Sequence, residues 1–94
     1  MNVIGIKILS EFSTRHADVR GQLSAWLKEA EEADWKCSHD IKQKYASASF
    51  LADNIVVFNI KSNDYRLVAK IDYKNQSVLI KKIGTHAEYS RWKL

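Results

Sequence analysis

The second half of the chain carries three segments rich in Val, Ile, Phe and Tyr, separated by connections of only four polar residues. The segments span residues 55–60, 65–73 and 78–83, and the connections are Lys61–Asp64 and Lys74–Ser77. Connections this short join antiparallel strands, because parallel strands need a crossover of about a dozen residues or more. The sequence therefore predicts an antiparallel three-stranded meander, against which the rest of the chain must pack.

The first half of the chain supplies a further strand candidate and two or three helices. Residues 2–9 place apolar side chains with period two, which predicts a strand. Ser10 then offers an N-cap for one or two helical turns that reach His16. We therefore expect the chain to start with a strand that leads into a short helix.

A stripe of apolar side chains at positions i, i+4, i+7, i+8 and i+11 from Val19 predicts an amphipathic helix. Asp18 is its candidate N-cap, and the pattern ends near Ala33. A short helix is expected after Ser38 as N-cap, and residues 46–54 read as a connection. The element order is therefore β-α-α-β-β-β, with an optional third helix and a C-terminal tail. This order predicts an α+β fold with helices on one face of a mostly antiparallel sheet.

Length and composition limit the class of protein further. Ninety-four residues suffice for one domain, 1–94, without room for a second core. The longest apolar run, residues 55–58, is far shorter than the roughly 20 residues of a membrane-spanning helix. The N-terminus lacks a signal-peptide pattern, and the single cysteine, Cys37, excludes an internal disulfide. We therefore expect a reduced, cytoplasmic chain that uses no metal or other cofactor.

The excess positive charge lies entirely in the second half of the chain. Residues 1–47 hold seven Lys or Arg and seven Asp or Glu, whereas residues 48–94 hold eight and four. The net charge of +4 therefore belongs to the half that is predicted to form the meander. Such a surface is the electrostatic footprint of a phosphate-rich partner, although a solvated lysine face that aids solubility has the same composition.

Strand alternation in residues 65–73 places Arg66 and Lys70 on the face opposite the apolar side chains. If Asn75-Gln76 form a two-residue turn, Lys70 lies across from Lys81, and the repulsion between them would be offset by a shared anion. The pattern therefore predicts an open basic face that includes Arg66, Lys70 and Lys81. The alternative is a register that differs by one residue, with the lysines splayed into water.

The C-terminal stretch Thr85–Glu88 matches the capping-box pattern of a helix start. His86 would lie in the first turn, where free backbone N–H groups favour an anion, and Tyr89 would share its face. Arg91 adds positive charge nearby. These residues predict a phosphate site that includes a titratable group. The alternative is that Tyr89 and Trp92 pack a short tail and that His86 is an ordinary surface residue.

With these motifs the chain resembles the HigB-type toxins of bacterial toxin–antitoxin systems, within the RelE-like superfamily. The resemblance implies a small antiparallel sheet with two helices packed on one face, in agreement with the element order above. The last of the four matching stretches is the most specific. The stretches are Ala33-Asp34-Trp35-Lys36, Val56-Val57-Phe58-Asn59-Ile60, Tyr65-Arg66-Leu67-Val68 and Gly84-Thr85-His86-Ala87-Glu88-Tyr89.

The resemblance also implies a function. Proteins of this kind are toxin components of type II systems and act as metal-independent endoribonucleases that cleave mRNA, generally on the translating ribosome. The implied partners are therefore mRNA, the ribosome and a cognate antitoxin, commonly a helix-turn-helix protein. Two other functions stay open: a non-enzymatic RNA-binding module, and an inactive toxin fold that only binds other proteins.

The resemblance assigns the candidate catalytic roles to residues of the matching motifs. His86 would act as the base that takes the proton of the RNA 2′-OH. Arg66 would hold the phosphate oxygens with its guanidinium fork, and Tyr89 would stack on a base or donate a proton. The basic residues expected to bind the RNA backbone are Lys70, Lys81, Lys82 and Arg91.

Overall fold

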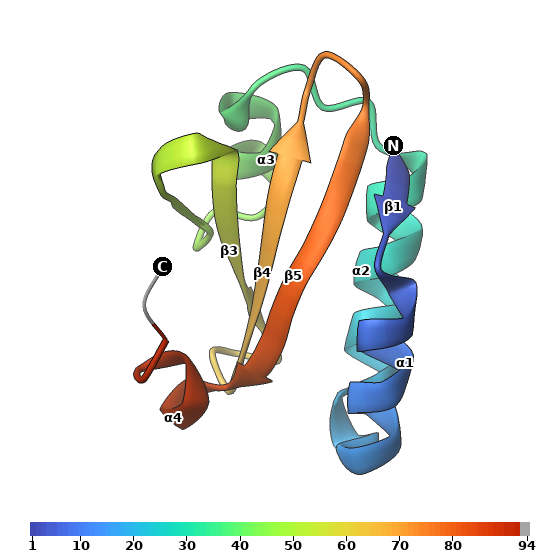
Figure 1. Ribbon diagram of the computed structural model, residues 1–94, viewed down its shortest axis with the longest axis vertical. Coiled ribbons are helices and arrows are strands. Elements are labelled where there is room, and N and C mark those ends of the chain that lie inside the picture. Colours follow the sequence, from blue (N-terminus) through green and yellow to red (C-terminus); the bar gives the residue numbers. More distant parts are fainter. Residues whose placement is uncertain (93–94) are drawn as a thin grey trace.

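A mixed sheet of five strands forms the centre of the protein in the computed structural model, which describes residues 1–92 (Figure 1). The strand order is β1-β5-β4-β3-β2; β1 runs parallel to β5, and the other neighbouring pairs are antiparallel. The strands are β1 (Asn2–Ile4), β2 (Ser49–Phe50), β3 (Ile55–Ile60), β4 (Tyr65–Asp72) and β5 (Ser77–Thr85). The helices are α1 (Ile6–Arg15), α2 (Arg20–Glu32), α3 (Ser38–Lys44) and α4 (His86–Tyr89), with 3-10 turns η1 (Ala17–Val19) and η2 (Ala52–Asn54).

Helices α1 and α2 lie side by side on one face of the sheet, and α4 lies at the opposite side, next to one end of β4 and β5 (Figure 1). Alternate strand residues point toward α1 and α2 and close a common core with them. The α+β fold with the order β-α-α-β-β-β and a short C-terminal helix is therefore confirmed. The buried core includes Leu9, Phe12, Leu23, Trp26, Phe58, Leu67, Ile71 and Ile80.

The strand predicted over residues 2–9 is only three residues long, β1; Gly5 follows it as the N-cap of α1, and residues 6–9 belong to that helix. Gly5 has a φ of +97°, a left-handed conformation that turns the chain out of the strand and into the helix. A Cβ added at Gly5 would lie 3.1 Å from the Ile80 carbonyl oxygen, so the close approach also favours glycine. Ser10 therefore lies inside α1, where its hydroxyl donates to the Lys7 carbonyl at 3.0 Å instead of capping a helix.

Helix α2 buries the predicted apolar stripe and ends one residue before the predicted Ala33. Asp18 does not cap this helix. Its carboxylate accepts hydrogen bonds from Lys61 Nζ at 2.8 Å and from Tyr65 Oη at 2.7 Å. These two hydrogen bonds lower the pKa of Asp18 below its ordinary value. Asp18 thus ties the start of α2 to the connection between β3 and β4.

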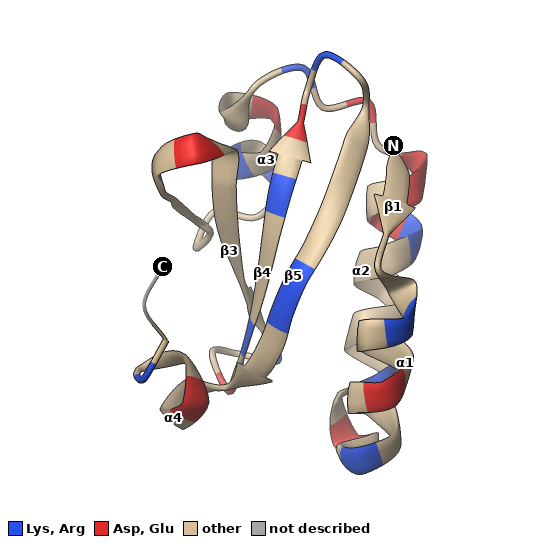
Figure 2. Ribbon diagram, viewed as in Figure 1, with Lys and Arg blue, Asp and Glu red and all other residues tan. Residues whose placement is uncertain are grey.

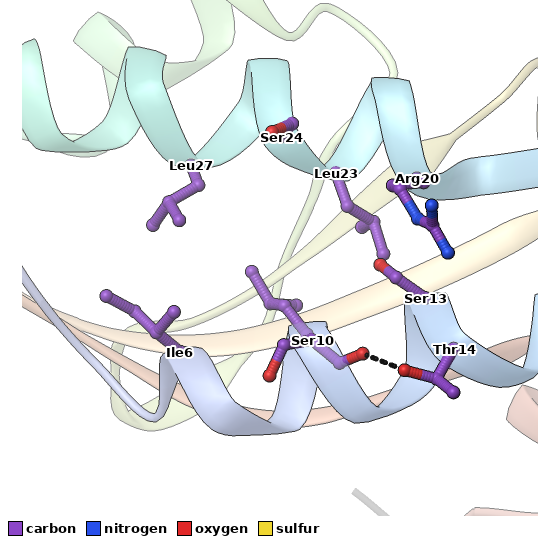
Figure 3. Close-up of a pocket in the computed structure, with 9 residues that line it drawn as sticks. Ile6, Ser10, Ser13, Thr14, Arg20, Leu23, Ser24 and Leu27 are labelled. Atoms are coloured by element: carbon purple, nitrogen blue, oxygen red, sulfur yellow. Dashed lines mark hydrogen bonds between the residues drawn. The ribbon is translucent and has the colours of Figure 1, made fainter. Parts of the chain in front are cut away.

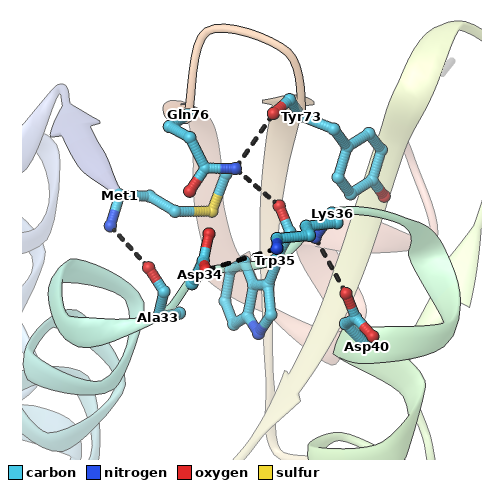
Figure 4. Close-up of polar contacts among 8 residues, drawn as sticks. All are labelled: Met1, Ala33, Asp34, Trp35, Lys36, Asp40, Tyr73 and Gln76. Atoms are coloured by element: carbon cyan, nitrogen blue, oxygen red, sulfur yellow. Dashed lines mark hydrogen bonds and ion pairs between the residues drawn. The ribbon is translucent and has the colours of Figure 1, made fainter.

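The C-terminal end of α2 carries several acidic residues, and positive groups lie against it. The Met1 amino group donates to three backbone carbonyl oxygens at this end, over 2.9–3.1 Å. Figure 4 shows one of these bonds, to the Ala33 carbonyl. Lys44 Nζ lies 3.5 Å from the carboxylate of Glu29, which also accepts a hydrogen bond from the Tyr45 hydroxyl. These contacts offset the unfavourable interaction of acidic side chains with the helix dipole and fix α3 against α2.

The connection predicted over residues 46–54 contains a short strand and a 3-10 turn. Strand β2 adds to the edge of β3, with Ser49 opposite Val57, and η2 follows it. A two-residue strand has no alternation to detect, so the sequence pattern does not reveal it. Helix α3 forms as predicted, but Ser38 is its first residue, and Cys37 occupies the N-cap without a side-chain hydrogen bond.

The meander forms as predicted, but the register of its last hairpin differs. Residues Tyr73–Gln76 make a four-residue loop in place of a two-residue turn, so Lys70 pairs with Leu79 and not with Lys81. Gln76 adopts a φ of +55°, and its side-chain amide donates to two carbonyl oxygens at 2.7 and 2.9 Å (Figure 4). The bond to the Tyr73 carbonyl closes the longer loop, and the bond to the Trp35 carbonyl ties the loop to the segment that follows α2.

A bulge in β5 changes the pairing halfway along the same hairpin. Val68 pairs with Lys82 and Ala69 pairs with Ile80, which leaves Lys81 as the extra residue. Ile80 points into the core, so Lys81 points away from it, and Lys82 shares the face of Val68. The bulge therefore sends two consecutive lysines to the sheet face that lies away from α1 and α2.

Candidate nucleic-acid interface

Four basic side chains share the sheet face away from α1 and α2, and we call them the basic face: Arg66, Lys70, Lys81 and Lys82. Figure 2 shows basic positions on the adjacent strands β4 and β5. The three lysines are exposed, and within residues 1–92 no carboxylate lies within 4.0 Å of them. Arg66, Lys70 and Lys81 therefore share one face as predicted, and the bulge adds Lys82 to it. The predicted opposition of Lys70 and Lys81 is wrong.

Arg66 differs from the three lysines because it is buried, with 8% of its surface exposed. Its Nη1 donates to the Asn63 carbonyl at 2.7 Å and to the Tyr65 carbonyl at 3.4 Å. Among residues 1–92 no carboxylate lies within salt-bridge distance of its guanidinium. A buried cation without an anionic partner is costly, and a bound phosphate would offset that cost.

Helix α4 has the predicted capping box. The Thr85 hydroxyl accepts from the Glu88 N–H at 3.2 Å, and the Glu88 carboxylate accepts from the Thr85 N–H at 2.9 Å. The bond from the Thr85 N–H lowers the pKa of Glu88, with smaller contributions from the nearby charges of Arg15 and His16. Glu88 therefore carries a negative charge at the start of this short helix.

The backbone at the start of α4 is less open to an anion than the sequence suggests. The His86 N–H donates to the Asp64 carbonyl at 3.0 Å, and the Glu88 N–H is taken by the capping box. A phosphate here would therefore have to be held mainly by side chains. The His86 ring is exposed and makes no hydrogen bond within the described residues, so it is free to act on a ligand.

Tyr89 and Trp92 connect α4 to the basic face. The Tyr89 ring centroid lies 5.5 Å from Arg66 Cζ, and the Trp92 ring centroid lies 5.3 Å from Lys82 Nζ. The two rings meet edge to face at 5.8 Å. Tyr89 and Trp92 therefore pack against each other, as the alternative interpretation of the C-terminal stretch expected. The same packing places them against Arg66 and Lys82. Arg91 is exposed beside them.

Two contacts of this region were not predicted from the sequence. Trp92 packs so closely on Gly84 that an added Cβ there would lie 2.7 Å from the indole. Asn63 supplies the carbonyl that holds Arg66. The available signal was Gly84 itself, since a glycine inside a strand indicates a close approach. Asn63 acts through its backbone, which leaves no signal in residue type.

A hollow lies between α1 and α2, away from the basic face (Figure 3). It has a volume of about 310 Å³, an apolar floor and a rim of hydroxyl groups. Within residues 1–92, no three His, Cys, Asp or Glu side chains are grouped so as to hold a metal ion. None of the helices in this range is long and apolar enough to cross a bilayer. The groove is lined by Ile6, Leu9, Ser10, Ser13, Thr14, Arg20, Leu23, Ser24 and Leu27.

The mixed sheet, its helical cover on one face and the short C-terminal helix define a RelE-like architecture. The family model described as HigB toxin, the RelE-like toxic component of a toxin–antitoxin system, matches residues 19–92. The chain therefore belongs to the HigB toxin family and is the toxin of such a system, which implies an antitoxin partner. No curated protein matches the chain in sequence. The matched region contains every residue of the basic face and α4, whereas β1 and α1 precede it.

Proposed function

We propose that this toxin is a metal-independent endoribonuclease that cleaves mRNA on the translating ribosome. The observation that carries the proposal is Arg66, a buried cation without a carboxylate partner among the described residues, set beside Tyr89 on the basic face. A buried guanidinium without a counter-ion destabilises the folded protein, and a bound anion would offset that cost. The phosphate of an RNA backbone is that anion.

The proposed chemistry gives each candidate residue a role. The RNA 2′-OH attacks the adjacent phosphorus and the P–O5′ bond breaks, which leaves a 2′,3′-cyclic phosphate and a 5′-hydroxyl. His86 takes the proton of the 2′-OH, and Tyr89 supplies a proton to the leaving oxygen or stacks on a base. Arg66 stabilises the additional negative charge on the phosphate oxygens. Lys70, Lys81, Lys82 and Arg91 hold the flanking backbone.

The ribosome contributes the positioning that the protein lacks. A net charge of +4 and a face of four basic side chains give modest affinity for free RNA. A codon held in a ribosomal site is already ordered, so the toxin needs only to supply the reacting groups. The cognate antitoxin, in this proposal a helix-turn-helix protein, restrains the activity in the host.

The test maps RNA 5′ ends after brief induction of the toxin, with and without a translation inhibitor. New ends within open reading frames, lost when translation is blocked, are the expected result. Arg66→Ala and His86→Ala should abolish these ends, whereas Arg20→Ala, an exposed arginine on α2, should keep them. RNA binding without new ends would identify a non-enzymatic binding module. Neither binding nor cleavage would identify an inactive toxin fold.

A further inference from the structure

A polar hollow of about 500 Å³ is lined by Ser47, Asn59, Ser62 and Asn63, two of which are partners of Arg66. Asn59 is the residue of β3 that pairs with Arg66 across the sheet. The Asn63 carbonyl accepts the 2.7 Å hydrogen bond from Arg66 Nη1. Asn63 therefore belongs both to the lining of the hollow and to the contacts of the guanidinium that is proposed to hold the scissile phosphate. The volume of the hollow suits a small ligand.

The side chains that line the hollow keep most of their hydrogen-bonding capacity. Asn59 Nδ2 donates to the Ser47 carbonyl at 2.9 Å, which leaves its Oδ1 without a partner in the described part of the chain. The Asn63 amide and the Ser62 hydroxyl likewise make no side-chain hydrogen bond within residues 1–92. An amide presents a donor and an acceptor side by side, which is the pattern that binds the edge of a nucleobase bidentately.

The turn that carries these groups has an unusual backbone. Lys61, Ser62 and Asn63 have φ values of +53°, +51° and +85°, so three successive non-glycine residues are left-handed. Two contacts hold the turn: Lys61 Nζ donates to the Asp18 carboxylate at 2.8 Å, and the His86 N–H donates to the Asp64 carbonyl at 3.0 Å. Strain of this kind persists where surrounding contacts fix it, and it clusters at ligand sites.

We propose that this hollow binds the nucleobase adjacent to the scissile phosphate and reads it through the Asn59 and Asn63 side chains. The proposal rests on the proposed function, since it takes the phosphate on Arg66 as its reference point. Asn63 lies in the connection between β3 and β4, and Arg66 follows as the second residue of β4, so the base-reading amide and the phosphate-binding arginine are only three residues apart. Base preference at the cut is set in this hollow, beside the reacting groups.

The first test measures binding without cleavage. The full-length protein is titrated with each of the four ribonucleoside 5′-monophosphates and with inorganic phosphate, while the Asn side-chain amide signals are followed by NMR. The nucleotides should shift the Asn59 and Asn63 amide signals, and phosphate alone should not. One nucleotide should bind at least about fivefold more tightly than the weakest.

The variant is Asn63→Gly, which removes the amide but keeps the carbonyl that holds Arg66 and tolerates the left-handed backbone. Asn54→Gly is the matched control, because Asn54 is an exposed asparagine with a φ of +60° at the other end of β3. Asn63→Gly should weaken nucleotide binding about fivefold or more and leave phosphate binding unchanged. Asn54→Gly should match the wild type. Unshifted amides, equal binding of all four nucleotides, or an unaffected variant would each overturn the proposal.

The second test reads the base next to each cut in the mapped RNA ends. Asn63→Gly should flatten the preference at that position, whereas Asn54→Gly should retain it. An unchanged preference in Asn63→Gly contradicts the base-reading role. The two proposals fail separately: a wild-type protein that binds nucleotides in the hollow but leaves RNA intact refutes the nuclease, and a nuclease whose amides ignore nucleotides refutes the hollow.

Discussion

The guanidinium of Arg66 and the ring of Tyr89 are in contact, with 5.5 Å between Cζ and the ring centroid. This contact joins the start of the central strand β4 to the C-terminal helix, although the two residues are far apart in sequence. A cation beside an aromatic face is stabilised by about 0.5–1 kcal/mol where it is exposed and by more where it is desolvated. Tyr89 therefore helps to hold Arg66 in place, whatever its hydroxyl does.

Substitutions of Tyr89 separate its ring from its hydroxyl. Tyr89→Phe keeps the ring contact with Arg66 and should retain the fold and the position of Arg66. Any loss of RNA cleavage in this variant therefore measures proton donation by the Tyr89 hydroxyl. Tyr89→Leu removes the ring face and should lower cleavage further, because Arg66 loses a neighbour that orients it. Both are measured as cleavage rates on programmed ribosomes. Equal activity of Tyr89→Leu and wild type would show that the contact has no role in the reaction.

Gly84→Ala should displace Trp92 from the sheet. The added Cβ would lie 2.7 and 2.9 Å from two indole carbons, closer than any stable contact. Trp92 is only half-buried, so we expect the ring to move out and the fold to survive. The indole N–H signal of Trp92 in NMR should shift, and cleavage should fall as α4 loses its support.

Gly21→Ala is the control for that substitution, because nothing lies within 4 Å of the added Cβ and the position is inside α2. It should raise the free energy of unfolding by about 0.5–1 kcal/mol and leave cleavage unchanged. A Trp92 signal that stays in place in Gly84→Ala would show that the close packing on Gly84 is not present in solution.

The sequence predicts the parts of this fold that depend on local patterns. The amphipathic stripe of α2, the strands of the meander and the Thr85–Glu88 capping box each rest on residues close in sequence, and each is confirmed. The first strand was predicted too long because Ile6 and Ile8 fit a strand and a helix equally well over so short a range. The conformation of Gly5 decides between them, and it depends on contact with distant β5.

The candidate site is predictable in composition but not in geometry. Alternation alone places Arg66 and Lys70 on one face, and this prediction holds for any register. The positions of Lys81 and Lys82 on this face depend on the bulge and on the longer loop, which the Gln76 side chain closes through the Tyr73 carbonyl. The burial of Arg66 depends on contacts with a turn and with α4, and no sequence pattern reports them.

Acid should remove a stabilising contribution of Asp18. Hydrogen bonds from Lys61 and Tyr65 lower the pKa of Asp18 in the folded state, so its contribution is present above the ordinary value of about 3.8 and is lost as pH falls through the lowered pKa. The melting temperature of Asp18→Asn should therefore lie below that of the wild type at neutral pH. The gap should narrow as the pH falls below about 4, because the unfolded chain then takes up a proton at Asp18 that the folded state, with its lowered pKa, still resists. A gap that stays constant down to about pH 2 would contradict this role of the carboxylate.

Removing a lysine from the basic face should reduce the salt dependence of RNA binding. Each phosphate contact on a single strand contributes about −0.7 to the slope of log K against log salt concentration. Lys70→Ala and Lys82→Ala should each make the slope shallower by about that amount. Lys28→Ala, an exposed lysine on α2, should leave it unchanged. Equal slopes in all three variants would place the RNA elsewhere on the protein.

His86→Ala should abolish growth arrest while the fold stays intact. The ring is exposed and α4 is capped by Thr85 and Glu88, so the change should alter stability by about 0.5 kcal/mol or less. Loss of an acid–base group costs about 10²–10⁴-fold in rate, which is far larger. Thr85→Ala is the control: it should cost about 1 kcal/mol of stability through the lost cap and reduce cleavage only slightly. Folded His86→Ala protein that still arrests growth at equal expression would move the base to Lys70 or Lys81.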